Sequence, residues 1–449
     1  MNFHPPAPKP HHRPLNALEF VWTMARNPLA IWSEAAFDEP VIKSEWLGVP
    51  TFIVNDPAAV RHVMVDNAKN YIMQPLRQRV LRPILRDGLL TAEGELWKRT
   101  RRSLAPVFAP RNTNGLAVAM LERSQLFADG LAAKAGTVTD IAKAMTLLTF
   151  DILQATLFTG DIAGDPDEFA AATTKLLHTM GRVDPMDVLD APAFMPRVTR
   201  LLGQKSQAYF RQLIAATIER RQELMRKAPD KAPRDLLTLL LEAEGLSRSE
   251  VEDNIITFIG AGHETTARAL GWTLYLLSQT LDERAKVEAE IDAHDFSDPN
   301  PYGWTEKLPY TRAAFEEAMR LYPPAPSLNR AALEADQVGR FSVPKGASVL
   351  VMPWVVHRHR RLWSRPTEFV PSRFLPDKRG AIDRYQYIPF GLGPRVCIGQ
   401  YFAMQEGVIA LAVLMRKLRF DYASDRAPEP VQKITVQPAG DLSMRVSVR

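Results

Sequence analysis

The sequence predicts a mostly α-helical protein with a small β portion. Helical periodicity dominates from about residue 57 to residue 325, and short apolar strand patterns occur before and after that span. The 46% hydrophobic and 24% charged residues are typical of a globular protein with a sizeable core. Because we find no internal repeat and no linker between separate cores, we expect one domain over residues 15–449.

The predicted elements follow in chain order. Residues 1–14 are Pro-rich and should form an extended or disordered tail. The segments VIKSEW and TFIVN predict two strands joined by a turn at residues 48–50, and Asp56 caps a helix that begins at Pro57. Short strands are expected between about residues 330 and 354. Further helices are expected near residues 94–107, 112–134, 140–158, 166–181, 197–226, 234–243, 248–279, 281–293, 310–321 and 400–417.

Charge and cysteine content limit the possible functions. A single Cys excludes an internal disulfide, which fits a reducing, cytoplasmic setting. The apolar segment that starts at Leu15 is interrupted by charges and by Pro28, so we expect no membrane span and no secretory signal. The net charge of +5 indicates an acidic partner, but no nucleic-acid-binding motif accompanies it. Each basic cluster taken alone is typical of a solvated helix face.

The only cysteine, Cys397, lies in the segment FGLGPRVCIG. Such a residue can be a small buried hydrophobic group, a nucleophile or a metal ligand. Its surroundings favour the ligand, because Gly393 and Gly399 permit positive φ and the close approach of a flat group. An apolar helix follows, whose N-terminus favours a thiolate, and Arg395 adds a cation. A thiolate held in this way can bind iron.

The same segment resembles the haem-binding loop F-x-x-G-x-R-x-C-x-G of the cytochrome P450 superfamily of haem-thiolate monooxygenases, and all five fixed positions are met. The resemblance implies the cytochrome P450 fold, a triangular α/β prism, with Cys397 as the proximal ligand of haem b. It also implies a set of haem-contacting residues: Trp97, Arg101, Ala261, Gly262, Arg330, Phe390, Gly391, Arg395 and Gly399.

The segment FEEAMRLYPP places Glu317 and Arg320 on one helix face. Alone, this spacing is typical of an ordinary surface ion pair. It is also similar to the E-x-x-R motif of the family, and PSRF supplies the arginine of its P-x-R-F segment. The resemblance implies a structural network of Glu317, Arg320 and Arg373. Glu316 is a competing assignment, but the residue three positions after it is Met319.

The segment AGHETT, residues 261–266, lies inside a long helical pattern. Glycine weakens a helix and threonine can bond back to it, so a kinked core helix is one interpretation. The segment is also similar to the I-helix motif of the family. The resemblance implies that O2 lies in a groove beside Gly262, and that Glu264 and Thr265 form the acid–alcohol pair that relays protons during catalysis.

The implied reaction inserts one oxygen atom from O2 into a C–H or C=C bond of a small hydrophobic substrate, while two electrons and two protons reduce the other atom to water. NAD(P)H acts only indirectly, through a ferredoxin or flavodoxin with its reductase. We expect that partner to dock on a basic face built from residues 98–102, 357–361 and 416–419 of a monomer.

Family position also assigns the substrate-facing segments, residues 71–90, 180–197 and 324–329 among them. Most of their uncharged residues are apolar, which suits a fatty acid, alkane, terpenoid or aromatic compound. The candidate pocket residues are Met73, Leu76, Leu85, Phe258, Ala261, Ser327, Leu328 and Ala439.

Other functions stay open at this point. A peroxygenase driven by H2O2 would need no acid–alcohol pair, and a haem-based sensing protein would need no catalytic machinery. A Cys-dependent hydrolase would need a His and an oxyanion site, and the segment around Cys397 offers neither. The segment WVVHRH departs from the family pattern, because His359 replaces a common acid. With His357 it could suggest a metal site, but an ordinary basic loop is the better interpretation.

Overall fold

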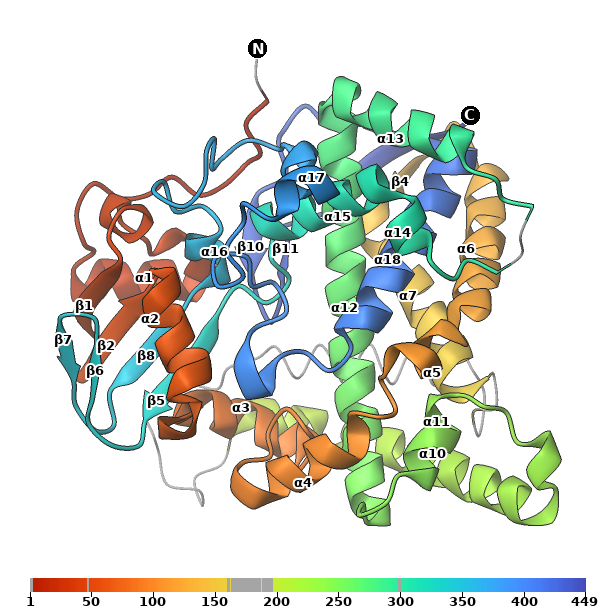
Figure 1. Ribbon diagram of the computed structural model, residues 1–449, viewed down its shortest axis with the longest axis horizontal. Helices are drawn as coiled ribbons and strands as arrows, with labels where there is room; N and C mark the ends of the chain where they lie inside the picture. The colour runs from red at the N-terminus through yellow and green to blue at the C-terminus, as the bar shows by residue number, and fades with distance from the viewer. Residues whose placement is uncertain (1–2, 47, 160–161, 163–186, 188–196, 298–299) are drawn as a thin grey trace. The chain divides into compact units, whose positions relative to one another are not determined.

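The computed structural model describes residues 3–46, 48–159, 162, 187, 197–297 and 300–449. The chain divides into two compact units. Unit 1 holds residues 1–72, 117–150 and 264–449, and unit 2 holds residues 73–116 and 151–263. Figure 1 follows the chain through its helices and strands. The single domain expected over residues 15–449 stays a prediction.

The helices and strands confirm a mostly α-helical fold with a small β portion. The α-helices are α1 (Ala17–Arg26), α2 (Pro57–Arg61), α3 (Pro75–Leu85), α4 (Gly94–Leu104), α5 (Pro110–Asn114), α6 (Ala117–Ala132), α7 (Ile141–Phe158), α10 (Val198–Lys227), α11 (Leu236–Glu242), α12 (Arg248–Gln279), α13 (Leu281–Ala293), α14 (Trp304–Lys307), α15 (Pro309–Leu321), α16 (Pro353–Val356), α17 (Pro376–Arg379) and α18 (Gln400–Lys417). Short 3-10 or π turns are η1 (Pro28–Ala30), η2 (Glu34–Phe37), η3 (His62–Asp66), η4 (Ala68–Asn70), η5 (Pro229–Lys231), η6 (Pro371–Phe374) and η7 (Gly393–Arg395). The strands are β1 (Val41–Trp46), β2 (Val49–Val54), β3 (Tyr71–Met73), β4 (Val138–Asp140), β5 (Leu328–Ala332), β6 (Asp336–Val338), β7 (Phe341–Val343), β8 (Ser348–Val351), β9 (Leu418–Tyr422), β10 (Pro430–Gln432), β11 (Val436–Pro438) and β12 (Ser443–Val448).

A five-stranded sheet with the order β1-β2-β8-β5-β3 forms the β part of unit 1. Strands β1 and β2 pair antiparallel, with Val41 opposite Val54, while β2 and β8 pair parallel. Alternate residues of the strands, such as Phe52 and Val349, enter one apolar cluster that also takes up Met64 of η3. Every second side chain of these strands therefore lies on the face of the sheet that this cluster covers.

The helical part of unit 1 packs around α18, which is buried along most of its length. Helices α6 and α15 both contact α18. A Cβ atom at Gly407 would lie 2.3 Å from the Phe315 ring, so only glycine allows α15 to approach α18 this closely. This packing holds the segment that precedes α18, which contains Cys397, against a rigid support.

Unit 2 contains its own buried charge network. Arg221 of α10 is completely buried and donates hydrogen bonds to Asp235 at 2.5 Å and to the carbonyl oxygen of Phe158 at 3.0 Å. Asp235 also caps α11 by accepting from the Thr238 backbone N–H. Paired in this way, the buried charges tie three segments of unit 2 together.

Several predicted elements agree closely with the structure. Helices α12, α13 and α18 have the predicted bounds, and Asp56 caps α2, which begins at Pro57. Residues 75–85 form α3, which was not among the expected helices. Helix α1 and the sheet β4-β12-β9 were also not expected. The predicted helix at 166–181 lies outside the described residues.

The Pro-rich segment at the N-terminus is extended and contacts the rest of unit 1. The Tyr322 hydroxyl donates to the Pro6 carbonyl at 2.9 Å, and the His11 backbone bonds to both Trp32 and Glu34. Composition alone did not anticipate these contacts. One helix among the described residues, α7, is long and apolar enough to span a membrane, and most of it is buried.

Candidate functional site

The loop before α18 holds Cys397 in a fixed geometry. The Cys397 backbone N–H donates to the Phe390 carbonyl oxygen at 2.8 Å. Gly391 and Gly393 have φ of 72° and 65°, a region that favours glycine. A Cβ atom at Gly393 would lie 1.9 Å from the carbonyl oxygen of Met64, so this loop can pack on η3 only with glycine there. The positive φ predicted for Gly393 is confirmed.

Gly399 does not have the positive φ that the sequence predicted. It is the N-cap of α18 with φ of −90°, so its backbone does not need glycine for a positive φ. A Cβ atom at this position would meet no atom within 4 Å. Cys397 is exposed, although most of the helix that follows is buried. The thiol therefore lies on the outside of a rigid support, close to a helix N-terminus that favours the thiolate.

This loop fits a haem. An exposed thiol at a helix N-terminus is the donor that thiolate-ligated haem requires. Two predicted cations for its propionates, Arg330 on β5 and Arg395 in η7, lie in the same unit as Cys397 and are half-buried. Leu328, a predicted pocket residue, has Cδ atoms 3.9 Å from where a Cβ of Gly391 would lie. Segments more than sixty residues apart thus meet at the cysteine loop.

Glu317, Arg320 and Arg373 form the predicted network. Glu317 and Arg320 are completely buried, and Arg320 donates to both carboxylate oxygens of Glu317 at 2.7 and 2.8 Å. The Arg373 Nε atom donates to Glu317 at 3.1 Å, and so does the Val370 backbone N–H at 2.9 Å. Glu316 instead forms ion pairs with other arginines, which excludes it from this network.

His357 connects this network to the cysteine loop, and sequence reasoning missed it. Its Nε2 atom accepts the Ile388 backbone N–H at 2.9 Å, and its Nδ1–H donates to the Arg320 carbonyl at 3.2 Å. Burial and the nearby cations Arg320 and Arg358 hold the pKa of His357 well below its ordinary value. The ring is therefore neutral and works as a fixed bridge. The WVVHRH motif was the available signal.

The interpretation of WVVHRH as an ordinary basic loop is wrong. His357, Arg358 and His359 are all buried, because the segment packs against Leu321 and the preceding helix. Arg358 stacks on the Trp354 ring at 3.6 Å. His359 faces the Glu39 carbonyl at 3.3 Å, so no ion pair replaces the missing acid. No cluster of three metal-ligating side chains occurs in the described part of the chain.

Helix α12 carries the predicted acid–alcohol pair. The helix is continuous through AGHETT, and its residues from Glu264 onward belong to unit 1. The Thr435 hydroxyl donates to Glu264 Oε1 at 2.8 Å, and Arg268 Nη2 lies 3.6 Å from the same oxygen. Thr265 is half-buried beside Glu264, and Thr266 is buried. Thr435 was not predicted, because 171 residues separate it from Glu264.

A second carboxyl group lies beneath this part of α12. Glu406 of α18 is 1% exposed and bonds to the side chain of Thr266. Burial raises the pKa of Glu406 to about 8, and the hydrogen bond from Thr266 opposes this only partly. Glu406 is therefore neutral at pH 7. The sequence offered no signal for this group.

Most of the other predicted haem and pocket residues belong to unit 2, whereas Ser327 and Ala439 belong to unit 1. Trp97 and Arg101 are four residues apart on α4 and are both half-buried. Phe258 is buried against the Phe108 ring, with ring centroids 4.8 Å apart. Ala261 is exposed, and Gly262 is half-buried near Leu153. The remaining candidates differ in burial: Met73 and Leu85 are buried, Leu76 and Ser327 are half-buried, and Ala439 is exposed. Of predicted segment 180–197, only Asp187 and Arg197 are described.

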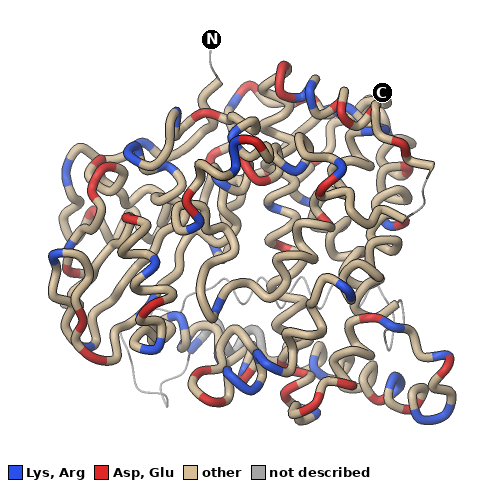
Figure 2. The backbone as a smooth tube through the Cα atoms, viewed as in Figure 1, with Lys and Arg blue, Asp and Glu red and all other residues tan. Residues whose placement is uncertain are grey.

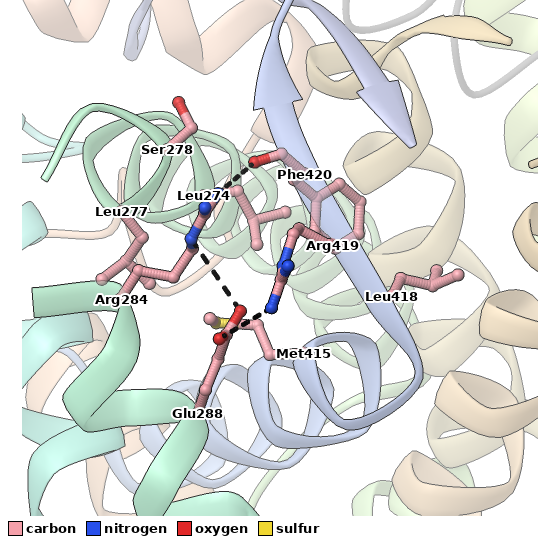
Figure 3. Close-up of a pocket in the computed structure, with 9 residues that line it drawn as sticks. All are labelled: Leu274, Leu277, Ser278, Arg284, Glu288, Met415, Leu418, Arg419 and Phe420. Carbon is pink, nitrogen blue, oxygen red and sulfur yellow. Dashed lines mark hydrogen bonds and ion pairs between the residues drawn. The ribbon is translucent and has the colours of Figure 1, made fainter. Parts of the chain in front are cut away.

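The basic clusters are largely paired with acids of the same chain. Figure 2 shows lysines and arginines interspersed with acidic residues along the described part of the chain. Arg419 lies 3.2 Å from Glu288, beside a cavity of about 10 Å³ at the start of β9 (Figure 3). Lys417 pairs with Asp129, and Arg360 pairs with Glu34 and Asp38. Residues 357–359 are buried and cannot present charge to a partner, so that part of the prediction is wrong.

The comparisons with known proteins identify a family for this chain. The family model for cytochrome P450 matches residues 5–443. Protein LUTEIN DEFICIENT 5, chloroplastic, of Arabidopsis thaliana is 30% identical over 84% of this chain and 66% of its own length. Cyclooctatin synthase of Streptomyces melanosporofaciens is 30% identical over 94% of this chain and 90% of its own.

A solved structure supports the fold independently. The crystal structure of the cytochrome P450DA heme domain superposes with a TM-score of 0.82 at 24% identity, over 99% of this chain and 98% of that one. At this identity the likeness shows the fold alone. Because the family model spans nearly the whole sequence, however, this chain belongs to the cytochrome P450 family, whose members are monooxygenases that use haem b and O2.

Proposed function

We propose that this chain oxidises a small hydrophobic substrate with haem b bound through Cys397, and that its electrons come from a separate ferredoxin or flavodoxin. The observation that carries the proposal is the exposed Cys397 thiol on a loop locked from two sides. Gly393 packs against the Met64 carbonyl, and the Ile388 N–H is bound by His357. A thiol held this firmly is suited to a single ligand geometry.

The residues of the loop would bind and orient the cofactor. When bound, haem supplies the activation of O2, and thiolate ligation favours cleavage of the O–O bond. The α18 N-terminus favours the ionised thiol, and Arg330 and Arg395 would bind the propionates by charge-assisted hydrogen bonds. The Glu317 network and His357 would keep the loop from shifting when the ligand binds.

Glu264 and Thr265 would supply protons. The Glu264 side chain is 15% exposed, so its carboxylate can exchange protons with water while the Thr435 hydroxyl holds Oε1. Thr265, next to it on α12, would accept and pass on the proton through its hydroxyl. A peroxygenase would not need this pair, which favours the O2-dependent reaction.

The substrate class rests on apolar candidates and on relatives. Ala261, Leu328 and Ala439 offer exposed or half-buried apolar positions. Relatives named cyclooctatin synthase and carotene epsilon-monooxygenase, chloroplastic, make carotenes and other terpenoids the first compounds to screen, ahead of fatty acids. The monomeric state, the cytoplasmic location and the regiochemistry of oxidation stay predictions.

The test is a carbon monoxide difference spectrum of the dithionite-reduced protein. We expect a Soret band shifted far to the red, and we expect Cys397→Ser to lose it. A band typical of histidine-ligated haem would disprove ligation by Cys397. Turnover with NADH and a plant-type [2Fe–2S] ferredoxin under ¹⁸O2 should then place ¹⁸O in the product. Product formed only with H2O2 would indicate a peroxygenase, and a protein that binds haem without turnover would be a sensor.

A further inference from the structure

One face of α12 contacts the C-terminal hairpin formed by β10 and β11. Glu264, Arg268 and Trp272 are four residues apart and therefore lie on the same side of the helix. The Trp272 Nε1–H donates to the Val436 carbonyl at 3.2 Å, and the Thr435 hydroxyl donates to Glu264 at 2.8 Å. Figure 1 shows the hairpin beside α12. Two adjacent residues of the hairpin are thus bound by side chains two turns apart on the helix.

The hairpin is held in place without Glu264. The Val436 N–H donates to the Pro324 carbonyl at 3.3 Å, and the Asn27 side chain donates to the Pro430 carbonyl at 2.9 Å. Thr435 is 2% exposed. These contacts position Thr435 independently of Glu264. We therefore infer that Thr435 orients the Glu264 carboxylate, and not the reverse.

Arg268 contributes a charge to the same contact. Its Nη2 atom lies 3.6 Å from Glu264 Oε1, too far for a hydrogen bond but close enough for attraction. Its Nη1 atom donates weakly to the Ala142 carbonyl at 3.4 Å, and its buried Nε–H has no hydrogen-bond partner within the described residues. Thr435 and Arg268 both act on Oε1, which leaves Oε2 as the oxygen for proton exchange.

We propose that Thr435 and Arg268 are positioning residues that fix the Glu264 carboxylate in the orientation from which it delivers protons. The proposal rests on the proposed role of Glu264. Without the hydroxyl of Thr435 the carboxylate would occupy several rotamers, and protons would arrive too slowly. Electrons would then leave as peroxide, by O2 + 2e⁻ + 2H⁺ → H2O2, rather than as water, by O2 + 4e⁻ + 4H⁺ → 2H2O.

The contact itself is tested first, by hydrogen exchange of the haem-loaded protein. Thr435→Val keeps the shape of the side chain and removes the donor. We expect the backbone amides of residues 433–437 to exchange about tenfold faster, since a hydrogen bond to a charged group is lost. Glu264→Gln should change the exchange of the Thr435→Val variant little, and Thr435→Ser should exchange as the native protein does. Thr273→Val, whose hydroxyl bonds only to the Ala269 carbonyl, is the matched control.

Proton delivery is tested by the ratio of NADH to O2 consumed with a plant-type [2Fe–2S] ferredoxin and its reductase, which needs no substrate. Release of peroxide consumes one NADH per O2, and formation of water consumes two. We expect Thr435→Val and Arg268→Met to lower the ratio toward one and to raise the peroxide yield severalfold, with recovery in Thr435→Ser. A peroxide yield equal to that of Thr273→Val would overturn the proposal.

Failure of the proposed function would look different. A native protein without the red-shifted carbon monoxide band, or without NADH-dependent O2 uptake, would contradict the monooxygenase assignment itself. The exchange experiment would still decide whether Thr435 holds Glu264. If Thr435→Val does not fold, the comparison of Arg268→Met with Thr435→Ser still tests the proposal, because the first removes the cation beside Oε1 and the second keeps the hydroxyl donor.

Discussion

Glu317 and Glu264 belong to the same compact unit, but the surroundings of their carboxyl groups differ. Glu317 receives two bonds from Arg320, one from Arg373 and one from the Val370 N–H. Within the described residues, Glu264 has one hydroxyl donor and one cation at 3.6 Å. A carboxylate that accepts four hydrogen bonds is fixed in position, whereas a carboxylate with a single donor keeps an oxygen free to take part in proton transfer. The region around Glu317 is therefore a structural frame, whereas the carboxylate of Glu264 is suited to proton transfer.

The frame should show the largest loss of stability on substitution. Glu317→Gln leaves Arg320 buried with an uncompensated charge, and we expect the free energy of unfolding to fall by about 3–5 kcal/mol. Urea unfolding monitored by circular dichroism measures this. The matched control is Glu316→Gln, since Glu316 pairs with arginines that are more than a third exposed. Equal losses in the two variants would contradict the distinction.

Glu406, beneath α12, should make stability depend on pH. Its folded-state pKa of about 8 lies above the ordinary 4.5, so the folded protein keeps a proton that the unfolded chain has lost. Stability is therefore fully present below about pH 4.5 and falls as the pH rises toward 8, by a few kcal/mol in total. Glu406→Gln should remove this slope and should be the more stable variant at pH 8. Parallel pH profiles for both proteins would refute a neutral Glu406.

Substitution of Glu264 should have the opposite effect from substitution of Glu317. It should reduce the rate of product formation and change the free energy of unfolding little. We expect Glu264→Gln to reduce product formation by about 10²-fold, because general acid catalysis contributes on that order, while unfolding changes by less than about 0.5 kcal/mol. Thr265→Ala should still bind haem but release electrons as peroxide. Product yield per NADH measures both variants. Full coupling of electrons to product in Thr265→Ala would exclude the proton relay.

The smallest effect should come from a surface cation. On α4, Lys98 pairs with Glu95 and Arg99 pairs with Glu250, while Arg102 is exposed. We expect Arg102→Glu to raise the ferredoxin concentration needed for half-maximal turnover severalfold at low salt, and the difference to vanish near 0.5 M salt. Lys345 is an exposed cation outside the predicted face, so Lys345→Glu should leave the required ferredoxin concentration unchanged. Equal values for Arg102→Glu and the native protein would remove α4 from the docking face.

The elements that sequence reasoning found are those with local signals. Helices α12 and α18 were predicted with their observed bounds, because helical periodicity depends only on near neighbours. Helix α3 was missed because residues 71–90 were assigned only by family position, as a substrate-facing segment, although Pro75 suits the first turn of a helix. Helix α1 has a capping box of Asn16 and Glu19 that could have been recognised.

The candidate site divides in the same way. Some residues of the site stand in motifs that are each at most ten residues long, and the resemblance to the family located them: Cys397, Glu317, Arg320 and Glu264. The partners that decide how these residues behave lie far away in the chain. Thr435 is 171 residues from Glu264, and His357 is 31 residues from Ile388. No periodicity or local spacing connects such pairs.

By itself, the sequence determined the helical architecture and the family, and it predicted the cysteine ligand, because each depends on residue types at short, fixed spacings. Only the tertiary structure decided which charged side chains are buried and which partners they have. It buried WVVHRH, which composition assigned to a basic surface. It raised the pKa of Glu406 by burial, and it placed Glu317 between two arginines. The physical reason is that ionisation depends on desolvation and on partners, and both are set by segments that folding alone brings together.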